Sequence, residues 1–181
     1  MKLLMIFSYF TDGFAYAGEA LTGRYIGAKD SLMVRQTVKW TFVWSMSIAL
    51  IFMVIYQFAG VPMLHMMTSD AVVIEASRNY LPWLLLMPVA GCAAFTWDGI
   101  YIGATASRQM RNSMLWAVVA FVIAWATGLL GLEWFIQNQT VAPGRYDGIA
   151  MHILMAAYFA HLLARTVYLT VKARKSVFSV I

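Results

Sequence analysis

Charged residues are scarce in this sequence, and cysteine is almost absent. Only 12% of the 181 residues are Asp, Glu, Lys or Arg, whereas 62% are hydrophobic. Several uncharged runs reach the length that crosses a lipid bilayer, which excludes an ordinary soluble domain. The one cysteine, Cys92, lies in an apolar segment and has no partner for a disulfide within the chain. We therefore predict an all-α, polytopic helical membrane protein.

The sequence also lacks the patterns of a catalytic or metal-binding protein. No cluster of His, Cys, Asp and Glu has metal-ligand spacing, no glycine-rich loop suits a phosphate, and no nucleophile stands at a recognisable distance from a base. The net charge of +5 does not indicate nucleic-acid binding, because the basic residues lie in short loops between apolar runs. We expect no enzyme activity, no catalytic or metal site, no nucleic-acid partner and no cofactor.

The apolar runs predict about five transmembrane helices. They cover approximately residues 3–24, 40–61, 80–106, 114–135 and 149–171. Gly60 and Pro62 are expected to end the second helix. Before the third, Ser69 or Asp70 is a plausible N-cap for a short amphipathic helix.

The distribution of basic residues predicts how these helices are oriented. The N-terminus and the loops after the second and fourth helices carry three basic residues, Lys2, Arg78 and Arg145. The other three loops carry nine: Arg24, Lys29, Arg35, Lys39, Arg108, Arg111, Lys172, Arg174 and Lys175. This asymmetry places the three loops with nine basic residues in the cytoplasm, and the C-terminus with them. We expect a membrane domain over residues 1–175 and a cytoplasmic tail over 176–181.

One carboxylate, Asp98, lies deep inside the third predicted helix. No charge occurs from Asn79 to Trp97, and none returns until Arg108. Ten residues at ~1.5 Å each put Asp98 about 15 Å from the charged end, near the midplane of a ~30 Å hydrocarbon layer. An acid there costs at least ~2.5–3.5 kcal/mol and normally faces a bundle interior or a water-filled path. A functional acid is our first interpretation, and a structurally paired acid is the alternative.

The first predicted helix carries two more acids on one face. Asp12, Ala15, Tyr16, Glu19 and Gly23 follow the 3–4 residue spacing of a helix face. Asp12 lies twelve residues before the basic end of this helix, about as deep as Asp98 in its own. Glu19 is shallower, so a role at the membrane interface is as plausible as a functional one.

Small residues and one arginine complete the membrane pattern. Gly99 and Gly103, like Gly23 and Gly27, form small-xxx-small pairs that favour close helix packing. Arg165 lies in the fifth helix, seven residues from Lys172, and we expect its side chain to snorkel to the interface.

Two segments resemble a known transporter family. TDGFAYAGEALTGRYIGA at residues 11–28, and WDGIYIGAT at 97–105 followed by MRNSM at 110–114, resemble the multidrug and toxic compound extrusion (MATE) family in its DinF-type bacterial branch. The resemblance covers nearly the whole chain. It implies the second of two six-helix lobes, from within the eighth helix to the twelfth, with the N-terminal lobe as a missing partner.

The resemblance implies antiport in a bacterial inner membrane. A proton or sodium ion would move inward while a lipophilic, often cationic compound moves out. Asp98 matches the tenth-helix acid implicated in cation coupling, and Asp12 matches an eighth-helix acid that lines the cavity; we add Glu19 as a third coupling candidate. The aromatic residues beside these acids are our candidates for the substrate cavity: Tyr16, Trp97 and Tyr101.

Two other functions stay open at this stage. A related lipid- or oligosaccharide-linked flippase would share the helical architecture, although the DinF-type motifs argue against it. A non-transporting membrane module would instead pair with other helical proteins through its Ala and Gly stripes. In either case membrane lipid surrounds the chain.

The charge asymmetry predicts an alternating topology that can be measured directly. Reporter fusions after residues 35, 70, 110, 140 and 181 should report inside, outside, inside, outside and inside, because basic loops are retained in the cytoplasm. Two consecutive fusions on the same side of the membrane would contradict this topology.

Overall fold

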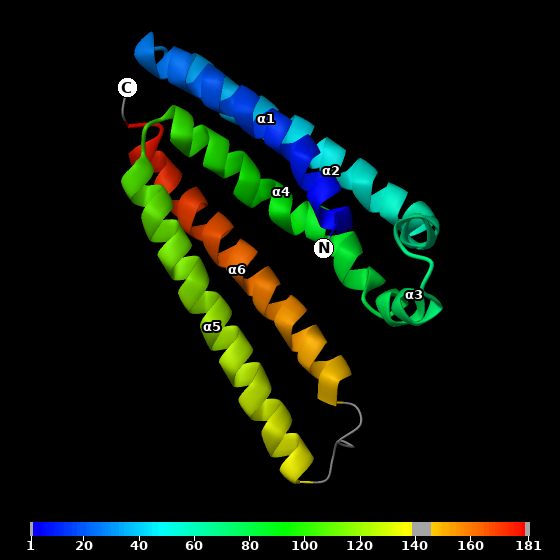
Figure 1. Ribbon diagram of the computed structural model, residues 1–181. Helices are drawn as coiled ribbons and strands as arrows, with labels where there is room; N and C mark the ends of the chain where they lie inside the picture. Colours follow the sequence, from blue (N-terminus) through cyan, green and yellow to red (C-terminus); the bar gives the residue numbers. More distant parts are fainter. Residues whose placement is uncertain (1, 139–145, 180–181) are drawn as a thin grey trace.

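The computed structural model describes residues 2–138 and 146–179, and all elements in these ranges are α-helices (Figure 1). The helices are α1 (Lys2–Gly27), α2 (Ser31–Met67), α3 (Ala71–Arg78), α4 (Leu81–Gly103), α5 (Ser107–Gln137) and α6 (Tyr146–Ser176). The all-α prediction is confirmed. The two last residues of the predicted tail, 180 and 181, lie outside the described ranges.

Four of these helices are long and apolar enough to cross a membrane: α2, α4, α5 and α6. The remaining predicted span corresponds to α1, which is 26 residues long but contains Asp12, Glu19 and Arg24. Because of these charges, α1 is not among the helices that are apolar enough to cross a membrane. The polytopic membrane class is therefore confirmed, and the membrane placement of α1 stays a prediction.

The second helix is longer than expected. α2 has 37 residues, begins at an N-cap where Asp30 Oδ1 accepts a hydrogen bond from Met33 N at 3.0 Å, and continues past Pro62 to Met67. The prediction that Gly60 and Pro62 end this helix is wrong. A proline removes one helical hydrogen bond, and such a loss is tolerated in membrane helices when neighbouring groups compensate. Gly60 lies against Leu81 of α4, so the helix is packed at this point.

The short helix α3 begins where the sequence predicts. Asp70 Oδ1 accepts hydrogen bonds from Val72 N at 2.9 Å and Val73 N at 3.4 Å, which satisfies two free donors of the first turn. The alternative cap, Ser69, is not used. α3 turns the chain from α2 into α4.

Helix α4 lies between the α1–α2 pair and the α5–α6 pair (Figure 1). Its closest contact is with α1. A Cβ atom at Gly99 would overlap the carbonyl group of Ala15, and one at Gly103 would overlap that of Glu19. Because residue numbers rise together along this contact, α1 and α4 run parallel. The predicted close-packing role of Gly99 and Gly103 is confirmed.

Of the predicted close-packing pair on α1, Gly23 and Gly27, only Gly23 packs closely. Gly23 lies against the backbone of Gly103, so this position allows the two helices to approach. Gly27 has no atom within 4 Å of where a Cβ would stand. The close-packing prediction for Gly27 is therefore wrong, because Gly23 already lies against Gly103, the last residue of α4.

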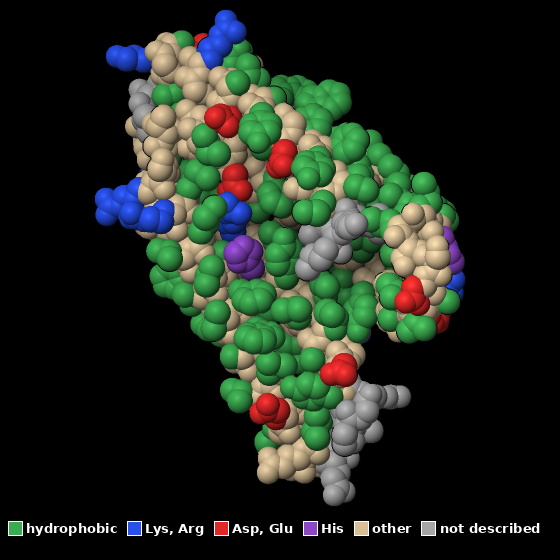
Figure 2. All heavy atoms as spheres, in the orientation of Figure 1, with side chains coloured by type: hydrophobic (Ala, Val, Ile, Leu, Met, Phe, Trp, Pro, Cys, Tyr) green, Lys and Arg blue, Asp and Glu red, His purple; other side chains and the backbone are tan. Residues whose placement is uncertain are grey.

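The helix ends that the charge rule assigns to the cytoplasm lie at one end of the bundle. Figure 1 shows the α1–α2 turn, the α4–α5 turn and the C-terminal end of α6 together, and Figure 2 shows Lys and Arg side chains gathered toward that end. The start of the predicted tail packs there as well. Val177 is fully buried beside Val34 and Val38 of α2, and the Arg35 guanidinium lies 5.2 Å from the ring centroid of Phe178.

The α1–α4 contact yields a stability prediction. We expect Gly99→Ala to lower the stability of the chain by about 1–3 kcal/mol, because the added methyl group meets backbone that cannot rotate away. Thermal unfolding in detergent measures this effect.

Gly131→Ala in α5 is the matched control, because nothing lies within 4 Å of its Cβ position. Alanine is favoured over glycine in a helix by about 1 kcal/mol, so this variant should be unchanged or slightly stabilised. Equal unfolding midpoints for Gly99→Ala and Gly131→Ala would contradict the packing argument.

Candidate functional site

Asp98 of α4 forms an ion pair with Arg165 of α6. Arg165 Nη2 lies 2.8 Å from Asp98 Oδ2, and the two side chains are only 11% and 19% exposed. The prediction that Arg165 snorkels to the interface is wrong. A nearby carboxylate within the bundle offsets the cost of burying the guanidinium, so the side chain turns inward. The pairing that we kept as the structural alternative for Asp98 is thus present.

Only part of each charged group takes part in this ion pair. Asp98 Oδ1 and Arg165 Nε are both buried, and neither has a hydrogen-bond partner among the described residues. An arginine–carboxylate pair in its strongest form uses two parallel hydrogen bonds. Here one carboxylate oxygen keeps its capacity to accept a proton or coordinate a cation.

Asp12 of α1 is the second acid at this place. It is half-buried and lies close enough to Asp98 for the two carboxylates to interact electrostatically. The glycine contact between α1 and α4 accounts for this approach, because Ala15 lies one turn from Asp12 and touches Gly99, the neighbour of Asp98. With two carboxylates and one guanidinium, the cluster has a net charge of −1 (−2 + 1) when His161 is neutral. It would be neutralised by one monovalent cation.

Glu19 does not belong to this cluster. Its side chain is half-buried and has no hydrogen bond or ion pair among the described residues. The main-chain carbonyl group of Glu19 faces Gly103 rather than Asp98. Seven residues of helix, about 10 Å, separate it from Asp12. Its role in ion coupling stays a prediction.

The aromatic candidates on α4 lie in the contact with α6. Trp97 Nε1 donates a hydrogen bond to Thr170 Oγ1 at 2.9 Å, and Tyr101 OH donates to the Leu169 carbonyl at 2.6 Å. Trp97 is 6% exposed and Tyr101 is fully buried, so neither lines an open cavity in this structure. Tyr16 on α1 is 69% exposed. Their assignment to a substrate cavity is untested.

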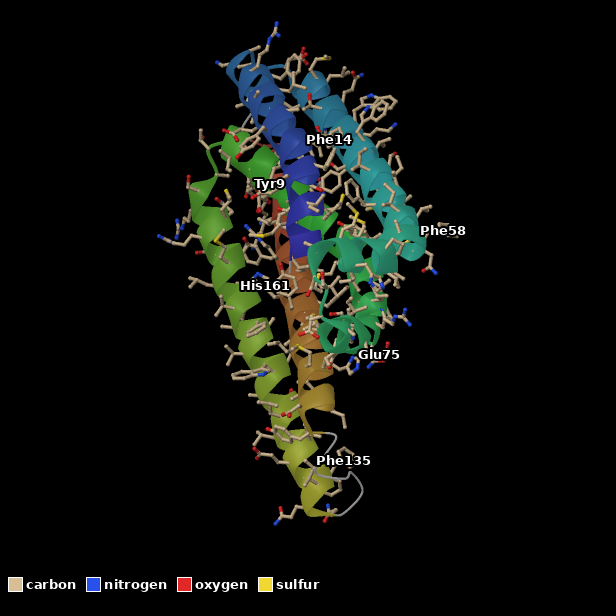
Figure 3. All side chains as sticks on the ribbon, turned by 45° about the vertical axis from the view of Figure 1, so that its right-hand side comes forward. Tyr9, Phe14, Phe58, Glu75, Phe135 and His161 are labelled. Atoms are coloured by element: carbon tan, nitrogen blue, oxygen red, sulfur yellow. The ribbon has the colours of Figure 1, made fainter. Side chains whose placement is uncertain are left out.

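Sequence reasoning missed the contribution of α6. His161 lies one turn before Arg165, stacks on Tyr158 with 6.1 Å between ring centroids, and forms a hydrogen bond with the backbone of Ala117 in α5. Figure 3 shows His161 on the side of α6 that faces α5, and Figure 2 shows acidic, basic and histidine side chains next to one another on this face. The four-residue spacing of His161 and Arg165 was the available signal, since it places both on one face of a helix.

An apolar cavity of about 580 Å³ lies farther from the basic end of the bundle. Its lining comes from α2, α3, α4, α5 and α6 and includes Tyr80, Trp83, Met87, Phe121, Met155 and Tyr158. One wall is fixed by a hydrogen bond from Trp83 Nε1 to His152 Nδ1 at 2.8 Å. Tyr158 lines this cavity and stacks on His161, so the cavity adjoins the charged cluster.

The profile of the MatE family matches residues 1–128. The chain is 37% identical over 134 residues to the DNA damage-inducible protein F of Escherichia coli (strain K12). This alignment covers 74% of the chain but 28% of that protein, so the chain spans a little over a quarter of its relative's length. No solved structure shows a significant match to the chain. The family match includes Asp12 and Asp98 but ends before Arg165.

The buried ion pair predicts unequal effects of removing each partner. We expect Arg165→Gln to cost about 3–5 kcal/mol, because it leaves the short Asp98 carboxylate buried without a counter-charge. Asp98→Asn should cost less, since the long Arg165 side chain can then extend toward the interface.

The double variant Asp98→Asn/Arg165→Gln is the control, because it removes both charges of the ion pair together. It should be more stable than Arg165→Gln alone, as measured by thermal unfolding in detergent at alkaline pH. Additive losses in the double variant would show that the two side chains do not interact.

Proposed function

This chain belongs to the MatE family, and from that premise we propose that it forms one lobe of a multidrug efflux antiporter. In this proposal a proton or a sodium ion moves inward while a lipophilic, often cationic compound is exported. The transporter lies in a bacterial inner membrane with the C-terminus of this chain in the cytoplasm. A second lobe forms the other wall of the transport path.

The unpaired oxygen of Asp98 is the observation that carries the proposal. Charged groups inside membrane helices are costly, and in transporters they mark ion pathways. Asp98 is held by Arg165 through Oδ2 alone, while Oδ1 remains buried and without a partner in the described chain. Asp12 adds a second negative charge nearby. Protons and sodium ions both bind carboxylate oxygens, so either ion can compete for this place.

The apolar cavity supports the choice of substrate class. A volume of about 580 Å³ lies within the range of small-molecule sites, ~300–1,000 Å³. Its methionine side chains adapt to differently shaped ligands, and its aromatic rings attract cations. A flexible apolar lining suits several lipophilic compounds better than one polar metabolite. The adjacent charged cluster gives the bound ion a route to influence this cavity.

The proposal predicts that Asp98→Asn abolishes ion-driven efflux in a transporter that includes both lobes. Asparagine keeps the size of the side chain but removes the charge that binds the cation. Asp12→Asn should reduce efflux less, because Asp12 does not hold the ion pair. Efflux of a fluorescent cation from vesicles under an imposed proton or sodium gradient measures both effects.

Asp147→Asn provides a matched control, because Asp147 is exposed in the first turn of α6. It should transport normally at equal protein abundance. The 181-residue chain alone should not transport, since alternating access needs two parts that move against each other. Near-normal efflux by Asp98→Asn would remove Asp98 from the coupling mechanism.

A further inference from the structure

We infer that Arg165 is an internal cation that competes with the transported ion for Asp98, and that ion binding therefore weakens the contact between α4 and α6. This inference rests on the proposed function and adds a positioning residue to it. Arg165 thus sets the affinity of Asp98 for the ion and does more than neutralise a buried charge.

The geometry of the pair makes such competition possible. Arg165 approaches Asp98 through one nitrogen and one oxygen, and a buried Nε and a buried Oδ1 remain without partners in the described residues. A pair held in this way lacks the second hydrogen bond that would lock it. A cation at Oδ1 would withdraw negative charge from the same carboxylate and so weaken its attraction for Arg165.

The charges around the pair favour the entry of one cation. Asp12 faces it from α1, and Tyr158 and His161 lie near Arg165 on α6. Within the described ranges, α2 and α5 bring no charged side chain into interaction with either partner. With His161 neutral, the net charge of −1 is therefore compensated by no further basic side chain of the described residues. A proton or a sodium ion neutralises the cluster while Arg165 stays charged.

The ion pair belongs to a short stretch of contacts that join α4 to α6. Next to it, Trp97 bonds to Thr170 and Tyr101 bonds to the carbonyl of Leu169. These residues lie within two helical turns of Asp98 and Arg165 on the same two helices. Releasing Arg165 removes the one charged contact of this stretch. The binding of an ion at Asp98 and the position of α6 are therefore coupled. Couplings of this kind typically change affinity by ~5–150-fold.

The test measures ion binding by the 181-residue chain in detergent. Sodium binding is measured by calorimetry against choline at constant ionic strength, and proton binding by indicator dye at constant salt. Removing the competitor in Arg165→Gln should raise the apparent affinity for at least one of these ions by ~5–150-fold. Arg165→Lys keeps a charge without the planar fork, so its affinity should lie between wild type and Arg165→Gln.

The controls separate competition from general damage. Asp98→Asn/Arg165→Gln should lose the tighter site, and Arg111→Gln, an exposed residue, should bind as wild type does. If Arg165→Gln does not fold, Arg165→Lys still reports the direction of the change. Unchanged affinity for both ions in every folded Arg165 variant would overturn the inference.

A second measurement follows the helices themselves. With Cys92 replaced by serine, spin labels at the exposed positions Ile102 on α4 and Val171 on α6 report their separation. Adding the ion that binds should lengthen this distance or broaden its distribution in wild type. It should do neither in Asp98→Asn/Arg165→Gln. The same distance with and without ion in wild type would overturn the coupling of α6 to the site.

These outcomes are distinct from the failure of the proposed function. Normal efflux by Asp98→Asn would refute the coupling role of Asp98, whatever Arg165 does to affinity. If efflux needs Asp98 while Arg165 variants bind ions as wild type does, only the present inference fails.

Discussion

A carboxylate inside a membrane helix needs a counter-charge, and the Asp98–Arg165 ion pair meets this need in the interior of the bundle. Breaking such a pair costs more than replacing both partners, because the remaining charge stays in a medium that solvates it poorly. The requirement fixes the position of α6 relative to α4, since Arg165 Nη2 must lie within ion-pair distance of Asp98 Oδ2, here 2.8 Å. The hydrogen bonds of Trp97 and Tyr101 to α6 then hold the same two helices in register.

The contact on the other side of α4 has a different physical basis. Gly99 and Gly103 carry no Cβ, so the backbone of α1 lies directly on α4 at Ala15 and Glu19. Dispersion forces between closely packed backbones drive such contacts in a membrane, where burial of apolar surface contributes little. This approach also brings Asp12 to Asp98. One glycine face thus supports both the packing and the charge of the site.

The sequence predicted the helices and the buried acid well, because both depend on local patterns. Uncharged runs define the apolar helices, and the small-xxx-small spacing at Gly99 and Gly103 predicts that another helix packs closely there, although not that this helix is α1. The partner of Asp98 could not be predicted in this way. Whether Arg165 turns toward the bundle or toward the interface depends on what faces it from another helix, and a single sequence does not contain that distance. The continuation of α2 past Pro62 could not be predicted for the same reason. Whether a proline ends a helix depends on tertiary packing around the helix, which a single sequence does not contain.

In the antiporter that we propose, an internal arginine resolves two opposing requirements. An unpaired acid would bind a cation tightly but would cost several kcal/mol to insert. An acid in a fully bidentate pair would insert easily but would have no oxygen left for the ion. Asp98 has one oxygen on Arg165 and one without a partner in the described residues, and Asp12 leaves the cluster one positive charge short. In the proposed transporter, this arrangement is stable enough to be buried, and its remaining negative charge would drive the binding of a monovalent cation.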